Sequence, residues 1–317
     1  MPLAIITGIT GQDGSYLAKS LLTKGYEVIG ITRSYNHSDV FKLKFLDIHN
    51  EVLIEECDLT DFSSILKIFK KYKPNEIYNL SAQSSVGISF EQPIGTIQYN
   101  ILTVINLLEA IKILELPTRF YQASSSEMYG KVKNLPINFD TPMHPLSPYA
   151  ISKATAFWTT INYRETYGLY VSNGVLFNHE SYLRSSKFFV KKVIQEAIKI
   201  KRGKQKFLKV GNIDVKRDFG YAPYYVEAMF LSLQQPLPDD YIICSGKSIS
   251  LRSIVLHVFN FLDLDLSLIK EDKNLMRPND IYDIYGDNTI AIKKLKWNYN
   301  FSFYDILDML IEEELRN

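Results

Sequence analysis

The chain of 317 residues has little cysteine and almost no excess charge of either sign. Its only two cysteines, Cys57 and Cys244, each lie in an apolar strand-like run. This fits two buried thiols better than a disulfide framework or a metal site, and it favours a reducing, cytoplasmic compartment. Lysine plus arginine number 36 and aspartate plus glutamate 35, a formal net charge of +1. No global field would therefore hold nucleic acid or an anionic membrane, and any anion must be bound locally.

Long apolar runs and internal repeats are also missing. The opening run Met1–Gly8 is too short for a signal peptide, and we expect no later stretch to approach the roughly 20 apolar residues of a membrane span. The composition, 46% hydrophobic and 22% charged, is that of a globular protein long enough for about two domains.

Strand-like and helical patterns alternate through the first half of the chain. The predicted strands are Leu3–Thr7, Glu27–Thr32, Val52–Glu56, Glu76–Asn79, Arg119–Ala123 and Tyr170–Leu176, and the predicted helices are Ser15–Lys24, Asp61–Tyr72, Ile94–Leu114 and Pro148–Tyr167. This alternation predicts an α/β protein with a Rossmann-type, doubly wound parallel sheet. Ligands of such sheets lie beyond the carboxyl ends of the strands.

The pattern changes after Phe177. A basic helix over Phe188–Lys201, a helix over Pro223–Gln234 and a strand over Tyr241–Cys244 are predicted among irregular segments. We therefore expect a dinucleotide-binding domain over residues 1–177, with a later return of the chain near 212–243, and a smaller substrate-binding lobe over 178–317.

A glycine-rich loop, Gly8-Ile9-Thr10-Gly11-Gln12-Asp13-Gly14, joins the first predicted strand to the first helix. Its glycines permit a tight turn and close backbone approach, while the helix N-terminus offers free N–H groups to a pyrophosphate. Because strand, loop and helix occur in the required order, the loop predicts dinucleotide binding rather than an ordinary glycine turn.

The second predicted strand ends in Arg33 and Ser34, where an enzyme that uses NAD usually has an acidic residue for the ribose hydroxyl. A cation and a hydroxyl suit a 2′-phosphate, so NADP is preferred over NAD. Asp58 follows the third strand and is placed to accept a hydrogen bond from the adenine amino group of the cofactor. Its alternative role is a helix N-cap, for which Asp61 is better placed.

Tyr149 and Lys153 form a Tyr-x-x-x-Lys pair at the start of a predicted helix, and their spacing puts both side chains on one face. Tyrosine has a pKa near about 10, but a neighbouring ammonium and a positive nicotinamide ring favour the phenolate. The pair therefore predicts an acid/base tyrosine.

The fifth strand leads into a serine-rich segment, Gln122–Gly130, which carries Ser125 and Glu127. A serine-rich turn would explain the hydroxyls, but a turn has no need of the Glu127 carboxylate beside a bound nucleotide. Glu127 is therefore a candidate catalytic base.

Six segments together resemble the GDP-mannose 4,6-dehydratase family of extended short-chain dehydrogenases/reductases. They are Thr7–Leu17, Tyr78–Ser84, Ser124–Gly130, Leu146–Tyr149, Phe177–Ser181 and Gly211–Asp218. The resemblance continues to Arg277-Pro278 and Gly286-Asp287 and covers nearly the whole chain. It implies NADP held through the cycle, a GDP-hexose substrate and a homodimer or homotetramer.

The resemblance also implies residue roles. Tyr149 would remove the proton of the sugar 4-hydroxyl, Lys153 would tune the phenol, and Glu127 would take the proton at carbon 5. Ser125, where the family carries threonine, would bond the 4-oxygen. The cofactor residues would be Gly8, Gly11, Gln12, Asp13, Gly14, Arg33, Asp58, Leu59, Leu80, Ser81, Ala82, Tyr149, Lys153, His179 and Arg184. The substrate residues would be Ser84, Asn178, Asn212, Lys216, Arg217 and Arg277, and no metal is expected.

Other functions remain open from the sequence. GDP-N-acetylglucosamine or a GDP-heptose would suit the same motifs. A reductase or epimerase would keep Tyr149 and Lys153 without requiring Glu127, and a dinucleotide-sensing module would require none of the three.

Overall fold

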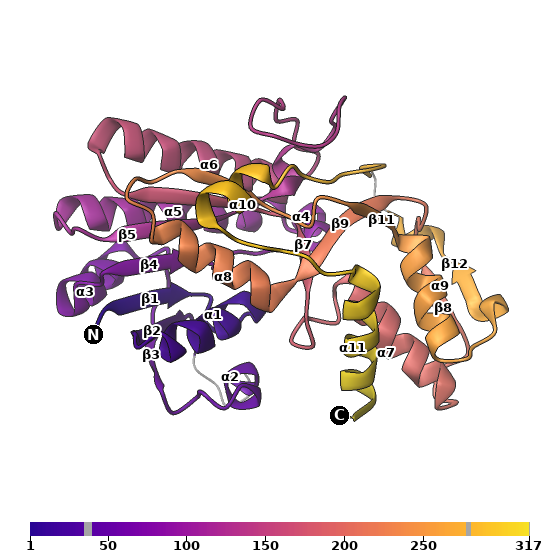
Figure 1. Cartoon of the computed structure of the whole chain (residues 1–317). Helices are drawn as coiled ribbons and strands as arrows, with labels where there is room; N and C mark the ends of the chain where they lie inside the picture. The colour runs from indigo at the N-terminus through magenta and orange to yellow at the C-terminus, as the bar shows by residue number, and fades with distance from the viewer. Residues whose placement is uncertain (35–39, 277–279, 317) are drawn as a thin grey trace.

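The computed structural model describes residues 1–34, 40–276 and 280–316 and contains a seven-stranded sheet in the order β10-β6-β5-β4-β1-β2-β3 (Figure 1). All of its strand pairs are parallel. The strands are β1 (Leu3–Thr7), β2 (Glu27–Thr32), β3 (Val52–Glu56), β4 (Glu76–Asn79), β5 (Arg119–Ser125), β6 (Val171–Leu176) and β10 (Asp240–Ile243). The predicted α/β class with a Rossmann-type parallel sheet is confirmed.

Helices cover both faces of this sheet. They are α1 (Gln12–Thr23), α2 (Phe41–Phe45), α3 (Phe62–Tyr72), α4 (Val86–Glu91), α5 (Pro93–Ile113), α6 (Pro148–Tyr167) and α8 (Ala222–Leu233). Successive strand residues point to opposite faces, so Ile5 packs in a core with Phe69 of α3 and Leu107 of α5. Ile6 packs in the other core with Leu17 of α1. Both faces are buried, which explains why the strands read as near-continuous apolar runs.

Helix boundaries follow local capping chemistry. The Asp61 side chain accepts from the Ser63 N–H at 3.0 Å and begins α3, which confirms that Asp61 rather than Asp58 is the N-cap. Ser147 caps α6 in the same way, with Pro148 as its first residue. The predicted start of α1 at Ser15 was late, because the helix begins at Gln12 inside the glycine loop.

Much of the chain after β6 forms a second body of structure, whose elements α7, α9, α11, β8 and β12 lie on the right of Figure 1. Its strands form two small sheets, β11-β9-β7 and β12-β8. The strands are β7 (Asn178–Glu180), β8 (Leu208–Val210), β9 (Lys216–Tyr221), β11 (Ser248–Ser250) and β12 (Ile269–Glu271), and the helices are α7 (Phe189–Lys201), α9 (Leu251–Phe261) and α11 (Phe303–Arg316). The helix α10 (Thr289–Leu295) packs instead against β10 and α8 of the first body. Between β9 and β11 the chain returns through α8 and β10, and β10 joins the large sheet beside β6. The Arg164 guanidinium lies 2.7 Å from the Asp240 carboxylate at this seam.

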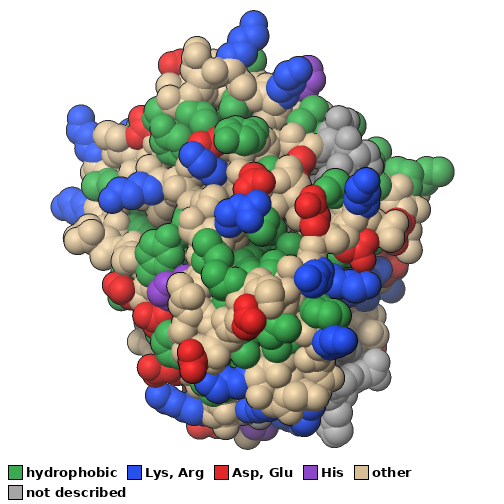
Figure 2. All heavy atoms as spheres, turned by 90° about the vertical axis from the view of Figure 1, so that its right-hand side faces the viewer, with side chains coloured by type: hydrophobic (Ala, Val, Ile, Leu, Met, Phe, Trp, Pro, Cys, Tyr) green, Lys and Arg blue, Asp and Glu red, His purple; other side chains and the backbone are tan. Residues whose placement is uncertain are grey.

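Charge is mixed over the face of the second body that Figure 2 shows, with basic and acidic side chains interspersed. This agrees with the formal net charge of +1. Cys57 and Cys244 are both buried free thiols, as predicted.

By length and composition alone, the 21-residue helix α5 would be able to cross a membrane. The expectation that no stretch approaches this length was therefore wrong. Half of its apolar window is buried within the protein, and the helix packs against α3 and α6.

Candidate active site

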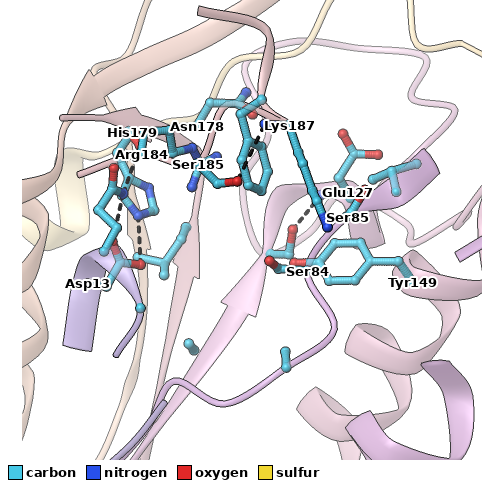
Figure 3. A pocket seen from close by; sticks show the side chains of 18 of the residues that line it. Asp13, Ser84, Ser85, Glu127, Tyr149, Asn178, His179, Arg184, Ser185 and Lys187 are labelled. Atoms are coloured by element: carbon cyan, nitrogen blue, oxygen red, sulfur yellow. Dashed lines mark hydrogen bonds and ion pairs between the residues drawn. The ribbon is translucent and has the colours of Figure 1, made fainter. Parts of the chain in front are cut away.

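A cavity of about 880 Å³ lies where the carboxyl ends of β1, β4, β5 and β6 meet the loop after β7. Asp13, His179 and Arg184 occupy one side of it, and Glu127 and Tyr149 the other (Figure 3). The topology therefore brings together the two sets of residues that the sequence assigned to cofactor binding and to catalysis.

The glycine loop fits a dinucleotide at one end of this cavity. Gly8 has φ +70°, and a Cβ there would lie 3.0 Å from the Leu80 carbonyl oxygen. A Cβ on Gly14 would lie 2.4 Å from the Gly8 oxygen, so the turn depends on glycine at both positions. Gly11 caps α1 without a side-chain hydrogen bond. The first N–H groups of α1 can therefore bind an anion in the cavity.

Asp13 and the buried His179 form a hydrogen-bonded pair beside this loop. The His179 Nδ1 lies 2.7 Å from the Phe177 carbonyl oxygen, and its Nε2 lies 2.9 Å from the Asp13 Oδ2. Burial alone would raise the pKa of Asp13, but the charge and hydrogen bonds of His179 and Gln12 outweigh it and lower this pKa to about 2. Both ring nitrogens thus face oxygen acceptors, which fixes the orientation of the His179 ring beside the glycine loop.

Two further cations line the same side of the cavity. The Arg184 guanidinium lies over the Phe188 ring, 3.5 Å from its centroid, and its Nε lies 3.5 Å from the Glu180 carboxylate. Lys42, on α2, donates from Nζ to the Thr10 carbonyl oxygen at 2.9 Å. Positive charge therefore surrounds the N-terminus of α1.

The residues after β4 are held against the loop by a buried hydroxyl. The Leu80 and Ser81 N–H groups donate to the Thr7 Oγ1 at 3.2 and 3.1 Å. Ser81 also bonds the Tyr99 hydroxyl at 2.6 Å. Leu80, Ser81 and Ala82 all line the cavity, where an adenosine or ribose would lie against backbone.

Arg33, Asp58 and Leu59 do not line this cavity. Arg33 is exposed and lies over the Tyr99 ring, 5.2 Å from its centroid. The Asp58 carboxylate is exposed and accepts from Thr60, while Leu59 is buried. Their cofactor roles stay predictions.

Tyr149 and Lys153 stand on the cavity side of α6, one helical turn apart. Burial raises the pKa of Tyr149 to about 12, although a hydrogen bond with Ser125 acts in the opposite direction. Burial also lowers the pKa of Lys153 to about 8. The Lys153 ammonium donates to the Ala123 carbonyl oxygen at 2.7 Å and lies 6.0 Å from the Tyr149 ring centroid. Burial therefore dominates the Tyr149 pKa, and the expected phenolate stays a prediction that depends on the positive charge of a nicotinamide ring.

Glu127 lies in a short 3-10 helix, Ser126–Met128, directly after β5. Ser125 caps this turn by accepting from the Glu127 N–H at 3.3 Å. Glu127 is half-buried, and its negative charge contributes to raising the pKa of Tyr149. The two candidate acid/base groups are therefore within electrostatic reach across one cavity.

The predicted substrate residues divide into two groups. Ser84 and Asn178 line the cavity. Asn212, Lys216 and Arg217 do not, and the buried Arg217 guanidinium is bound to the Asp280 carboxylate at 2.7 Å and to the Ile281 carbonyl oxygen.

Arg277 lies outside the described residues. Within the described ranges, no group of three or more His, Cys, Asp or Glu side chains is arranged to hold a metal ion.

Sequence reasoning missed two cavity cations, Lys42 and Lys187. Lys42 lies on a helix of five residues, too short for helical periodicity to reveal. Lys187 extends toward the side of the pocket that holds Ser84 and Tyr149 (Figure 3). No motif marked either residue.

Comparison with known proteins shows the family. The profile described as "GDP-mannose 4,6 dehydratase" matches residues 5–310. A GDP-mannose 4,6-dehydratase of Sinorhizobium fredii is 38% identical over 338 residues, covering 99% of this chain and 96% of that protein.

Two solved structures show the same fold. The dTDP-glucose 4,6-dehydratase DesIV of Streptomyces venezuelae, with NAD and TYD bound, has a TM-score of 0.88 at 20% identity over 99% of this chain and 97% of that one. RMD of Pseudomonas aeruginosa, complexed with NADPH, has a TM-score of 0.83 at 24% identity over 100% of both chains. The sequence match over nearly the full length, together with this fold and cavity, shows that the chain belongs to the GDP-mannose 4,6-dehydratase family.

Proposed function

We propose that this chain removes one water from GDP-mannose and forms the GDP-4-keto-6-deoxy sugar. The observation that carries the proposal is the meeting of Glu127 with Tyr149 and Lys153 in one cavity, at the opposite side from the glycine loop. A reductase or epimerase needs only the tyrosine and lysine, whereas a dehydratase needs a second base.

We infer that NADP is the cofactor. The glycine cradle, the free N-terminus of α1 and the cations around it suit a dinucleotide, and the structurally similar proteins above carry NADPH or NAD. When bound, the nicotinamide supplies a hydride acceptor with a positive ring and later returns the hydride to carbon 6.

Tyr149 is the proposed base for the sugar 4-hydroxyl. Its pKa of about 12 keeps the phenol protonated at neutral pH unless positive charge comes close. Lys153, one turn along α6, keeps an ammonium near the ring, and Ser125 bonds the phenol and lies where the 4-oxygen would arrive. Together these groups take up the hydroxyl proton as carbon 4 is oxidised.

Glu127 is the proposed base at carbon 5. The 4-keto group acidifies the carbon 5 proton, which the Glu127 carboxylate accepts, and the same proton leaves with the carbon 6 hydroxide as water. With the hydride returned to carbon 6, protonation of carbon 5 would complete the product, and the proton that Tyr149 took from the 4-hydroxyl balances this last step. The sugar loses one water with no net change in redox state.

The test is incubation with GDP-mannose, GDP-N-acetylglucosamine and a GDP-heptose, each scored by mass spectrometry. Loss of one water from GDP-mannose is the expected result. Water loss from only one of the other two sugars would reassign the substrate. Tight NADP binding without turnover of any of them would favour a dinucleotide-sensing module.

Two variants separate the half-reactions. Glu127→Gln keeps the size of the side chain and removes the base, so dehydration should fall by about 10²–10⁴ while sugar-dependent nicotinamide absorbance still appears. Tyr149→Phe should abolish both signals, and Glu165→Gln, exposed on α6, is the matched control. Dehydration by Glu127→Gln at the wild-type rate would return the chain to the reductase or epimerase class.

We further infer the division of labour along the chain. Residues 1–177, completed by α8 and β10, would hold the dinucleotide. Residues 178–317 would supply nucleotide-sugar contacts, with Asn178, Asn212, Lys216, Arg217 and Arg277 as the candidates. A homodimer or homotetramer in the cytoplasm is the proposed working state, and light scattering measures the assembly.

A further inference from the structure

Helix α2 contributes one side chain, Lys42, to the wall of the cavity. Its neighbours do not share this position: Leu43 is buried in the core, and Lys44 is exposed. The Lys42 Nζ lies 2.9 Å from the Thr10 carbonyl oxygen, inside the glycine loop. An ammonium has three N–H donors, and this contact uses one of them.

The surroundings of Lys42 favour an anion as its further partner. Burial lowers the pKa of Lys42, the Asp13 charge raises it, and the Arg184 charge lowers it again. Holding an ammonium partly desolvated beside a second cation is unfavourable, and an anionic ligand reverses both effects. The position is therefore that of a binding cation rather than of a surface lysine.

The position of Lys42 in the cavity indicates which anion it binds. The Gly8 N–H donates to the Ile31 carbonyl oxygen at 3.2 Å, which ties the start of the loop to the end of β2. Thr10 is two residues beyond Gly8, and Lys42 reaches it from the segment that follows β2. The adenosine ribose of a dinucleotide lies beside the end of this strand. Arg33, which also follows β2, leans over Tyr99 and does not line the cavity.

We propose that Lys42 is a specificity-determining residue that binds the ribose 2′-phosphate of NADP. The inference rests on the proposed function, since it assumes that the cavity takes a nicotinamide dinucleotide. Lys42 on α2 would then act in addition to Arg33, the predicted 2′-phosphate residue at the end of β2. NADP is then recognised by the Lys42 ammonium in the cavity, and NAD brings no 2′-phosphate to it.

The test is direct binding without any sugar. Calorimetry should show that Lys42→Gln weakens NADP binding about ten- to hundredfold, the range of one hydrogen bond to a charged group, and changes NAD binding by less than about twofold. Lys44→Gln, the same change two residues along α2, should leave both affinities as in the wild type, and Lys42→Arg should retain most NADP affinity. Unchanged NADP binding by Lys42→Gln would overturn the proposal. Equal losses for NADP and NAD would also overturn it, because they would place Lys42 at the pyrophosphate.

A second measurement uses the wild-type protein and needs no folded variant. Lysines are acylated with an amine-reactive reagent at saturating NADP or NAD, and the extent at Lys42 is read by mass spectrometry. Protection by NADP and not by NAD is expected, and equal protection by both contradicts the proposal. If Lys42 is protected equally by NADP and NAD, the proposed dehydration of GDP-mannose still stands. If the wild type binds neither dinucleotide, the proposed function itself is contradicted.

Discussion

Replacing Asp13 by asparagine removes one charge from the buried Asp13–His179 pair and should destabilise the folded protein. The pKa of Asp13 is lowered from 3.8 to about 2. One pKa unit corresponds to about 1.36 kcal/mol, so the carboxylate contributes about 2 kcal/mol at pH 6. The asparagine oxygen would still accept a hydrogen bond from His179, but the negative charge of the carboxylate would be gone.

The pH dependence of this loss has a definite sign. A carboxyl whose pKa is lowered on folding stabilises the protein above the pKa of the unfolded chain, and this contribution is lost as pH falls through the folded value. The difference in free energy of unfolding between wild type and Asp13→Asn should therefore be about 2 kcal/mol at pH 6 and about half of that at pH 3.

Urea unfolding of wild type and Asp13→Asn at pH 6 and pH 3 measures this free-energy difference at both pH values. Asp47→Asn makes the same change at an exposed carboxylate and should shift stability by less than about 0.5 kcal/mol. A free-energy difference for Asp13→Asn that is equal at the two pH values would refute the electrostatic account. It would mean that Asp13 stabilises the protein through shape alone.

Three further predictions concern the ligands. Arg33→Asp should reverse or erase the preference for NADP over NAD, because a carboxylate repels a 2′-phosphate and accepts from a ribose hydroxyl; equal wild-type affinities for the two cofactors would contradict this. GDP should compete with the substrate while UDP and dTDP should not, and calorimetry showing dTDP as tight as GDP would reject the guanine assignment. Gly14→Ala should abolish dinucleotide binding, because its Cβ would lie 2.4 Å from the Gly8 oxygen; fluorescence titration with an unchanged NADP affinity would show that the loop relaxes without loss.

The strands of the large sheet were predictable because most of them are short buried runs, as in β1 and β2, that alternate with helical patterns. Leu3–Thr7 and Glu76–Asn79 match β1 and β4 residue for residue. Helix α2 escaped prediction because its five residues contain little more than one helical turn, so no period can be recognised. Because α2 was not predicted, Lys42 was not recognised as a cavity residue.

The site was predictable in its membership but not in its electrostatics. The spacing of Tyr149 and Lys153 places both on one side of α6, but it does not show that the Lys153 ammonium is bound to the Ala123 carbonyl. Nor does spacing reveal burial, which controls the Tyr149 pKa. Arg217 stands in a family motif, yet tertiary packing turns its guanidinium to Asp280. The partners of Lys153 and Arg217 and the pKa of Tyr149 depend on contacts between segments that are distant in the chain. A single sequence does not reveal these contacts.

The return of the chain through β10 has a consequence for synthesis on the ribosome. β6 ends at Leu176, but its outer partner begins only at Asp240, so β6 remains an open edge while more than sixty residues are still to emerge. Open edges invite pairing with other chains. The nascent protein is therefore most vulnerable to aggregation between these two points, and ribosome-stalled chains ending before and after β10 should differ sharply in protease resistance.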